Sequence, residues 1–109
     1  MTEMDNLFSE IPLSLPEELI QILVENRCHR LERIVSDGHA TPPGEWYDQT
    51  WDEWVVLLSG SAGLLFEGES KPVVMKPGDY LLIPAHLRHR VEWTDGSGKT
   101  AWLALHFNL

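Results

Sequence analysis

Short apolar runs separated by turn-forming residues dominate the chain from residue 27 onward. Turn signals recur about every 8–12 residues, a spacing typical of small β-sandwiches and barrels. In "MKPGD", Pro77 and Gly78 predict a type II turn, in which glycine supplies the positive φ. The runs that predict strands are 28–36, 53–60, 62–68, 72–75, 80–84, 89–93 and 101–107. The pattern therefore predicts an all-β domain.

One segment near the start has a helical pattern instead. In "SLPEELIQIL", Ser14 and Glu17 have the spacing of a capping box. The apolar side chains at positions 15, 19, 22 and 23 fall on one face of a helix. We therefore expect one short helix within an N-terminal extension, residues 1–27, followed by a single β-domain over residues 28–109.

The charge of the chain narrows the classes of partner. Its formal net charge is −9 over 109 residues, which disfavours nucleic acid and anionic membrane surfaces, because both attract clustered Lys and Arg. No run approaches the about 20 apolar residues that span a bilayer. The acidic start "MTEMDNLFSE" is unlike a secretory signal, so we expect a cytoplasmic protein. Cys28 is the single cysteine, and we interpret it as a small packing residue.

Two half-motifs in the β portion resemble those of the cupin family. Glu53 is followed by six residues and then Gly60, as in the second half of the first cupin motif. Gly78 is followed by five residues, Pro84, a residue, His86, two residues and His89, as in the second cupin motif except that His86 replaces a glycine. The resemblance covers roughly residues 30 to 107 and implies a jelly-roll β-barrel.

The resemblance also implies a metal site, and here the sequence departs from the family. Cupins hold a divalent metal (iron, manganese, nickel or zinc) with two histidines of an H-x-H motif, the Glu and the second-motif His. Glu53 and His89 match, but the H-x-H positions carry Tyr47 and Gln49. A Gln oxygen is a weak ligand, so the candidate metal set is Gln49, Glu53 and His89, with a further histidine needed to complete it. Alternatively, Glu53 and His89 form a buried, charge-assisted pair without a metal.

Strand alternation extends this candidate site to a pocket. If the strand is unbroken, Tyr47, Gln49 and Trp51 lie on the same face as Glu53, with Tyr47 at the mouth. Trp93 lies on the same face as His89. The loop and the last strand add two histidines to the expected pocket, and the full set beyond the metal candidates is Tyr47, Trp51, Trp93, His39 and His106.

Three functions remain open from the sequence. The first is a cupin that binds a small molecule without turnover. The second is an oxygenase, isomerase or lyase on a small polar substrate, either with a divalent metal or with His89 or Glu53 as general base and Tyr47 as acid. The third is an interaction module. The apolar face of Trp54, Val56 and Leu58 predicts a homodimer.

Overall fold

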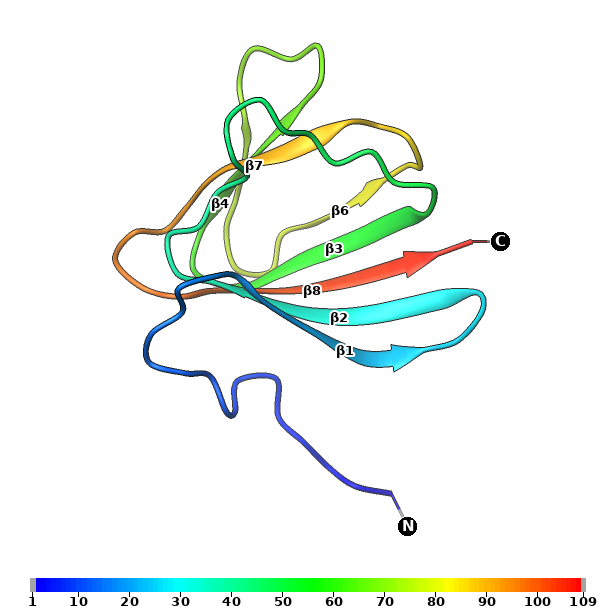
Figure 1. Ribbon diagram of the computed structural model, residues 1–109, viewed down its shortest axis with the longest axis vertical. Helices are drawn as coiled ribbons and strands as arrows, with labels where there is room; N and C mark the ends of the chain where they lie inside the picture. Colours follow the sequence, from blue (N-terminus) through cyan, green and yellow to red (C-terminus); the bar gives the residue numbers. More distant parts are fainter. Residues whose placement is uncertain (1, 109) are drawn as a thin grey trace.

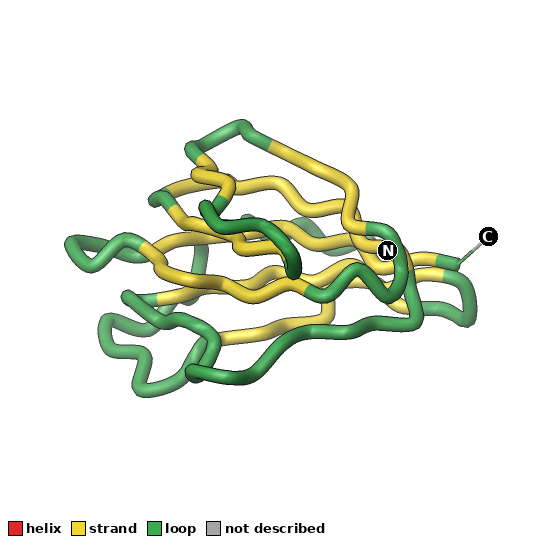
Figure 2. Tube along the Cα trace, turned by 90° about the horizontal axis from the view of Figure 1, so that it is seen from above, coloured by secondary structure: helices red, strands yellow, loops and turns green. Residues whose placement is uncertain are grey.

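The alternating pattern folds into eight β-strands that form two antiparallel sheets (Figure 1). The structure is a computed structural model that describes residues 2–108. Its strands are β1 (Leu19–Glu25), β2 (His29–Ser36), β3 (Asp52–Ser59), β4 (Ala62–Phe66), β5 (Val73–Met75), β6 (Tyr80–Ile83), β7 (His89–Thr94) and β8 (Thr100–Phe107). The larger sheet has the order β1-β2-β8-β3-β6 and the smaller one β5-β4-β7. Figure 2 shows the strands stacked in layers, with long loops running along one side.

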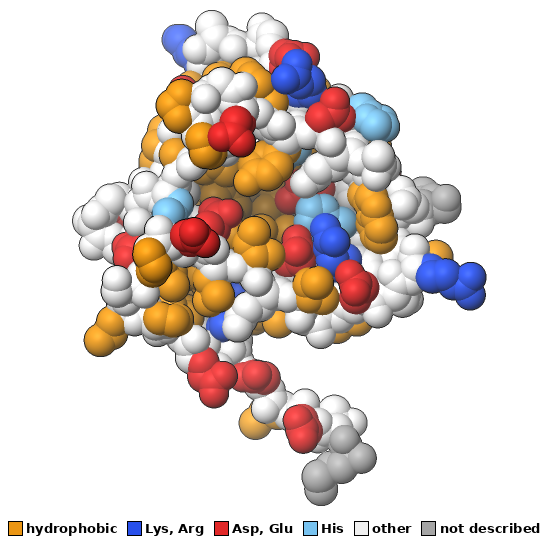
Figure 3. Space-filling model, viewed as in Figure 1, with side chains coloured by type: hydrophobic (Ala, Val, Ile, Leu, Met, Phe, Trp, Pro, Cys, Tyr) orange, Lys and Arg blue, Asp and Glu red, His pale blue; other side chains and the backbone are white. Residues whose placement is uncertain are grey.

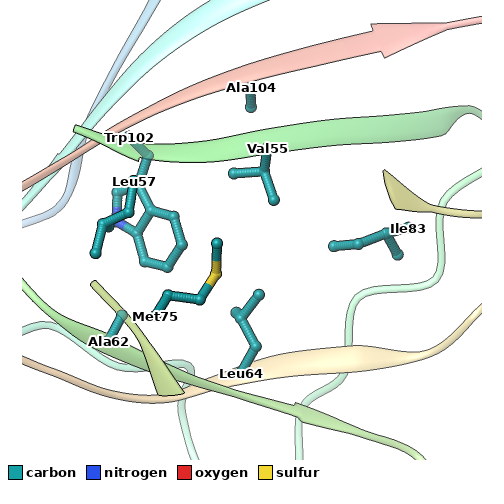
Figure 4. Packing of buried hydrophobic residues seen from close by; sticks show 8 residues of the cluster. All are labelled: Val55, Leu57, Ala62, Leu64, Met75, Ile83, Trp102 and Ala104. Carbon is teal, nitrogen blue, oxygen red and sulfur yellow. The ribbon is translucent and has the colours of Figure 1, made fainter. Parts of the chain in front are cut away.

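The apolar core fills the space between the two sheets at one end. Leu57 pairs with Trp102 and Val55 pairs with Ala104 across β3 and β8. These side chains face the smaller sheet, whose contribution includes Leu64 (Figure 4). The complete buried cluster is Val55, Leu57, Ala62, Leu64, Met75, Ile83, Trp102 and Ala104. The next inward position along β3 and β8 is a polar pair, so the core forms the floor beneath a polar region.

The N-terminal helix expected over residues 14–23 is wrong. That segment instead leads into the edge strand β1, with Leu19 opposite Val35 and Ile20 opposite Ile34 of β2. Branched side chains also recur at every second residue from Ile20, and this period of two suits a strand. Pairing with the free edge of β2 overrides the local capping signal. No helix forms within residues 2–108, and hence none that is long and apolar enough to cross a membrane.

The turn before β6 is confirmed. The N–H of Asp79 donates to the carbonyl of Lys76 at 2.9 Å, and Gly78 has a φ of 92°. This is the type II geometry that only glycine adopts without strain. Further hydrogen bonds link the turn to Leu57, so it also fixes the β3–β6 pairing next to the core.

The outward side of the larger sheet carries an apolar patch, which we call the outer patch. It comprises Trp54, Val56, Leu58, Tyr80, Leu82, Leu103 and Leu105. Tyr80 is 67% exposed and Leu82 is 54% exposed, and the Tyr80 ring lies 5.5 Å from that of Trp54. None of these side chains is charged, although the chain has a net charge of −9. Depletion of charge is typical of the centre of a protein interface.

The homodimer expected from the sequence stays a prediction, and the outer patch is where it is tested. Light scattering at micromolar concentration is expected to give the mass of two chains. Leu82→Asp places a charge in the patch and is expected to give monomers. Val74→Asp is the matched control, because Val74 is 56% exposed but lies in the smaller sheet. A monomeric wild-type protein would refute the dimer.

Candidate functional site

A cavity of about 230 Å³ opens between the two sheets above the apolar core. In Figure 3 the molecule is hollowed near its middle, with hydrophobic side chains at the floor and acidic side chains and histidines around them. Five of the side chains expected at the site line the cavity: Tyr47, Gln49, Glu53, His89 and His106. Three further polar side chains line it without having been expected there: Glu18, Arg30 and Glu32.

Glu53 and His89 face each other across the cavity from opposite sheets. Glu53 lies in β3 and is 7% exposed, and His89 begins β7 and is 5% exposed. Oε1 of Glu53 lies 3.7 Å from Nε2 of His89, which is beyond hydrogen-bond distance. Within residues 2–108, no group donates a hydrogen bond to the Glu53 carboxyl. Among residues 2–108, Nε of Arg30 is the fully buried side-chain polar atom without a hydrogen-bond partner, so the free atoms of Glu53 and His89 reach the open space of the cavity, where a ligand can meet them.

The surroundings of this pair favour its uncharged forms. Burial raises the pKa of Glu53 to about 7, and the nearby carboxylate of Glu32 adds to the shift. Burial lowers the pKa of His89, against the opposing effect of its hydrogen bond to the Leu87 carbonyl. That bond, 2.9 Å from Nδ1, places the proton on Nδ1 and leaves a lone pair on Nε2. At neutral pH, Glu53 is therefore about half protonated and His89 presents a base to the cavity.

A second carboxylate–imidazole pair lines the same cavity, but its two side chains are hydrogen-bonded to each other. Nε2 of His106 lies 2.8 Å from Oε1 of Glu32, and both side chains are buried. The other oxygen of Glu32 lies 3.5 Å from Nε of Arg30. Burial lowers the pKa of His106, and the Glu32 carboxylate opposes that shift. Glu32 thus has a hydrogen-bond partner in His106 and a cation nearby in Arg30, whose Nε makes no hydrogen bond, whereas Glu53 has neither.

Tyr47 forms the mouth of the cavity, as expected. It is 42% exposed, and its ring stacks on that of His89 with 5.6 Å between centroids. Its backbone pairs with His89 in both directions, through N–H···O bonds of 2.8 and 3.1 Å. Burial and the charges of Glu18 and Glu53 raise the pKa of the Tyr47 phenol, so it remains a hydrogen-bond donor.

Three side chains expected in the pocket do not line it. Trp51 lies just before β3, which begins at Asp52. The centroid of its ring is 6.0 Å from Cζ of Arg30, which lies over it. Trp93 is turned outward by a β-bulge, because one extra residue of β7 between Val91 and Trp93 reverses the alternation. Its indole instead lies against Gly63 of β4, where an added Cβ would come within 2.4 Å of Nε1. His39 accepts a hydrogen bond from the Asp37 backbone in the preceding loop.

The missed residues had a weak signal in the sequence. Glu32 alternates with Ile34 on the inward face of β2, and a lone carboxylate among apolar residues on one face marks a buried polar group. Glu18 lies just before β1, in the segment expected to be helical, and its Oε2 accepts a hydrogen bond from the Ser36 hydroxyl at 2.6 Å. Its place at the cavity depends on the β1–β2 pairing, which the helical interpretation concealed.

Comparison with known proteins identifies the family. A model of the cupin domain matches residues 33–106, which include β3 to β7, half of β2 and most of β8. The chain belongs to the cupin family. The expected jelly-roll β-barrel is confirmed for this cupin, apart from the helix. The comparison with curated proteins found no match.

Solved structures agree with this assignment. A protein of Ralstonia eutropha JMP134 that carries the provisional name mannose-6-phosphate isomerase has 51% identity and a TM-score of 0.95, over 99% of this chain and 100% of its own. A cupin superfamily protein of Desulfitobacterium hafniense DCB-2 has 19% identity and a TM-score of 0.72, over 89% and 83%. The polyketide cyclase RemF of Streptomyces resistomycificus has 20% identity and a TM-score of 0.72, over 84% and 66%. The last two share the fold.

The donor set of this cupin does not fit the metal centre of its family. Tyr47 and Gln49 line the cavity at the positions of the two motif histidines. His106 is the histidine nearest to completing the set, since it pairs with Glu53 across β3 and β8, but its Nε2 is bound to Glu32. Among residues 2–108, no three His, Cys, Asp or Glu side chains form a group that can hold a metal ion.

Replacing Glu53 is expected to change how stability depends on pH. The carboxyl has a pKa of about 7 in the folded chain against an ordinary 4.5, so ionising it destabilises the folded state progressively between those values. Glu53→Gln removes this effect. Its free energy of unfolding relative to wild type is expected to rise by about 2–3 kcal/mol between pH 5 and pH 8.

Urea unfolding at pH 5 and pH 8 measures the free energy of unfolding of both proteins. Both contain His89 and His106, so the contributions of these histidines cancel when the two free energies are subtracted. Glu69→Gln is the control, because it removes a carboxylate from the exposed turn after β4. A difference between Glu53→Gln and wild type that is the same at pH 5 and pH 8 would show that Glu53 is not a buried acid.

Proposed function

We propose that this cupin binds a small molecule without negative charge in the cavity between its sheets, in contact with Glu53 and His89. The observation that carries the proposal is the pair of Glu53 and His89. We call it the open pair, because its two side chains lie 3.7 Å apart and are not hydrogen-bonded to each other. Two polar side chains that are at least nine-tenths buried reach into the cavity and are not hydrogen-bonded to each other. A mostly apolar cavity with a few convergent polar groups is the usual form of a ligand site.

The size and charge of the cavity limit the ligand. Its volume of about 230 Å³ is below the about 300–1,000 Å³ typical of sites for drug-sized molecules. Its charged lining consists of the carboxylates Glu18, Glu32 and Glu53 against the single guanidinium of Arg30. A dianionic phosphate would meet net repulsion there. The sugar phosphate in the name of the Ralstonia relative is therefore not the ligand that we propose.

Thermal-shift screening of the EDTA-treated protein tests this function. Small polar compounds of all charge types, including mannose and mannose 6-phosphate, are compared on wild type and on Val91→Phe, which fills the cavity. We expect uncharged or cationic compounds to raise Tm in wild type and not in Val91→Phe. Val74→Phe is the control on the exposed side of the smaller sheet and is expected to keep the shifts.

Two outcomes would oppose the proposal. One is that no compound gives a shift that depends on an open cavity. The other is binding of mannose 6-phosphate that Val91→Phe abolishes, which would show that the cavity accepts a dianion.

A proton-transfer enzyme is the second candidate function, because the open pair combines an acid and a base. Nε2 of His89 can take a proton from a carbon next to a carbonyl, while the protonated Glu53 gives its proton to the carbonyl oxygen. If that carbon bears a hydroxyl, the product is an enediol. The ionised Glu53 then takes the proton of this hydroxyl while the protonated His89 returns its proton to the former carbonyl carbon, which gives the isomer. The 3.7 Å between the two groups allows both to reach one small substrate.

Hydrogen exchange in D₂O measures this chemistry directly. Wild type is expected to introduce deuterium into dihydroxyacetone or glyceraldehyde, followed by NMR. Glu53→Gln and His89→Gln are expected to reduce the rate to background, with folding checked by circular dichroism, and Glu69→Gln to leave it unchanged. Exchange by wild type that is no faster than by Glu53→Gln would remove this candidate.

A further inference from the structure

We infer that the ligand carries a protonated nitrogen, an ammonium or amidinium group, and that this group lies between the Glu53 carboxylate and Nε2 of His89. The inference rests on the proposed binding function and names the chemical class of its ligand. It assigns the open pair to cation recognition, in place of proton transfer.

The hydrogen-bonding pattern at this point of the cavity consists of acceptors. Nδ1 of His89 donates to the Leu87 carbonyl, so Nε2 can only accept. The ionised Glu53 carboxylate also only accepts, and the two face each other at 3.7 Å. A hydroxyl brings one donor, whereas an ammonium brings three and an amidinium brings a planar pair. A protonated nitrogen can therefore satisfy both side chains at once, and it brings the positive charge that a neutral amide lacks.

The charges around the cavity leave the Glu53 carboxylate without a partner. Glu32 is matched by His106 at 2.8 Å and by Arg30 at 3.5 Å. Arg30 also lies over the Trp51 ring, and among residues 2–108 no ion pair joins it to Glu53. The missing positive charge is therefore supplied by the ligand, since a buried carboxylate is stabilised most by a charged donor.

Two aromatic rings pack against the His89 ring. The Tyr47 ring, which lines the cavity mouth, stacks 5.6 Å from the His89 ring, and the Phe66 ring lies 6.1 Å from His89 on the β4 side. A cation within about 6 Å of an aromatic face is attracted by the electrons of the ring. Tyr47 can therefore cover the nitrogen once it has entered.

Binding of a cation is expected to depend on pH in a defined direction. With a pKa of about 7 in the free protein, Glu53 is mainly protonated at pH 6 and mainly ionised at pH 8. Affinity should therefore rise about tenfold between these values, and binding should release a proton. The other titratable or charged groups that line the cavity with Glu53 are Glu18, Glu32, Arg30, His89, His106 and Tyr47. Burial lowers the pKa of both histidines, which favours their neutral forms.

Calorimetry with two matched series of probes tests the inference. The first is pentylammonium, pentan-1-ol and pentanoate, and the second is benzylammonium, benzyl alcohol and benzoate. We expect the two amines to bind wild type at millimolar concentration or better, about tenfold tighter at pH 8 than at pH 6. The alcohols should bind at least tenfold more weakly, and the carboxylates should not bind.

Variants assign the binding to the open pair. Glu53→Gln keeps the shape of the side chain and is expected to lose at least tenfold in amine affinity, together with the pH dependence. Glu69→Gln, the exposed control, is expected to bind as wild type does. Amine binding that is equal in Glu53→Gln and wild type would overturn the inference.

The outcomes also separate this inference from the proposed function. Alcohols that bind as tightly as the amines, with loss in Val91→Phe, would overturn the cationic ligand and leave the binding function standing. Failure of both amines to bind overturns the cationic ligand. If the compound screen also finds no shift that depends on the cavity, the binding function fails as well.

Discussion

The antiparallel register between β3 and β8 is the constraint on which the rest of the structure depends. It places Leu57 opposite Trp102, Val55 opposite Ala104, and Glu53 opposite His106, all facing the smaller sheet. Because side chains alternate along a strand, a slip of one residue would turn this whole inward row outward. The apolar floor and the polar cavity are therefore consecutive parts of one row.

Two carboxylate–imidazole pairs share this interior and behave differently because of their surroundings. Glu32 and His106 lie in neighbouring strands of one sheet, at hydrogen-bond distance, with Arg30 beside them. Glu53 and His89 come from opposite sheets, and the width of the barrel holds them apart. The first pair satisfies its own polar groups and stabilises the interior. The second is left open by the distance between the sheets, and titratable groups with shifted pKa values in a cavity are typical of sites that meet a ligand.

The sequence predicted those parts of the molecule that depend on local pattern. The strands from β2 to β8 follow from alternation and turn residues, and Glu53 and His89 follow from the spacing of the cupin half-motifs. Trp93 could not be placed, because the bulge in β7 that turns it outward is defined by pairing with β4. The strand β1 could not be predicted from its helical spacing, because the free edge of β2 decides its conformation. Glu18 was missed for the same reason.

The backbone bonds between Tyr47 and His89 have a consequence for how this barrel can diverge. The loop that carries Tyr47 and Gln49 is attached to β7 through main-chain atoms, and Arg90 holds the same loop through the carbonyl of Thr41 at 2.9 Å. None of these attachments uses the side chains at 47 and 49. The wall of the cavity thus keeps its position whatever those two side chains are. A barrel built in this way can exchange metal-binding imidazoles for a phenol and an amide, and acquire new chemistry, without rebuilding the chamber in which that chemistry takes place.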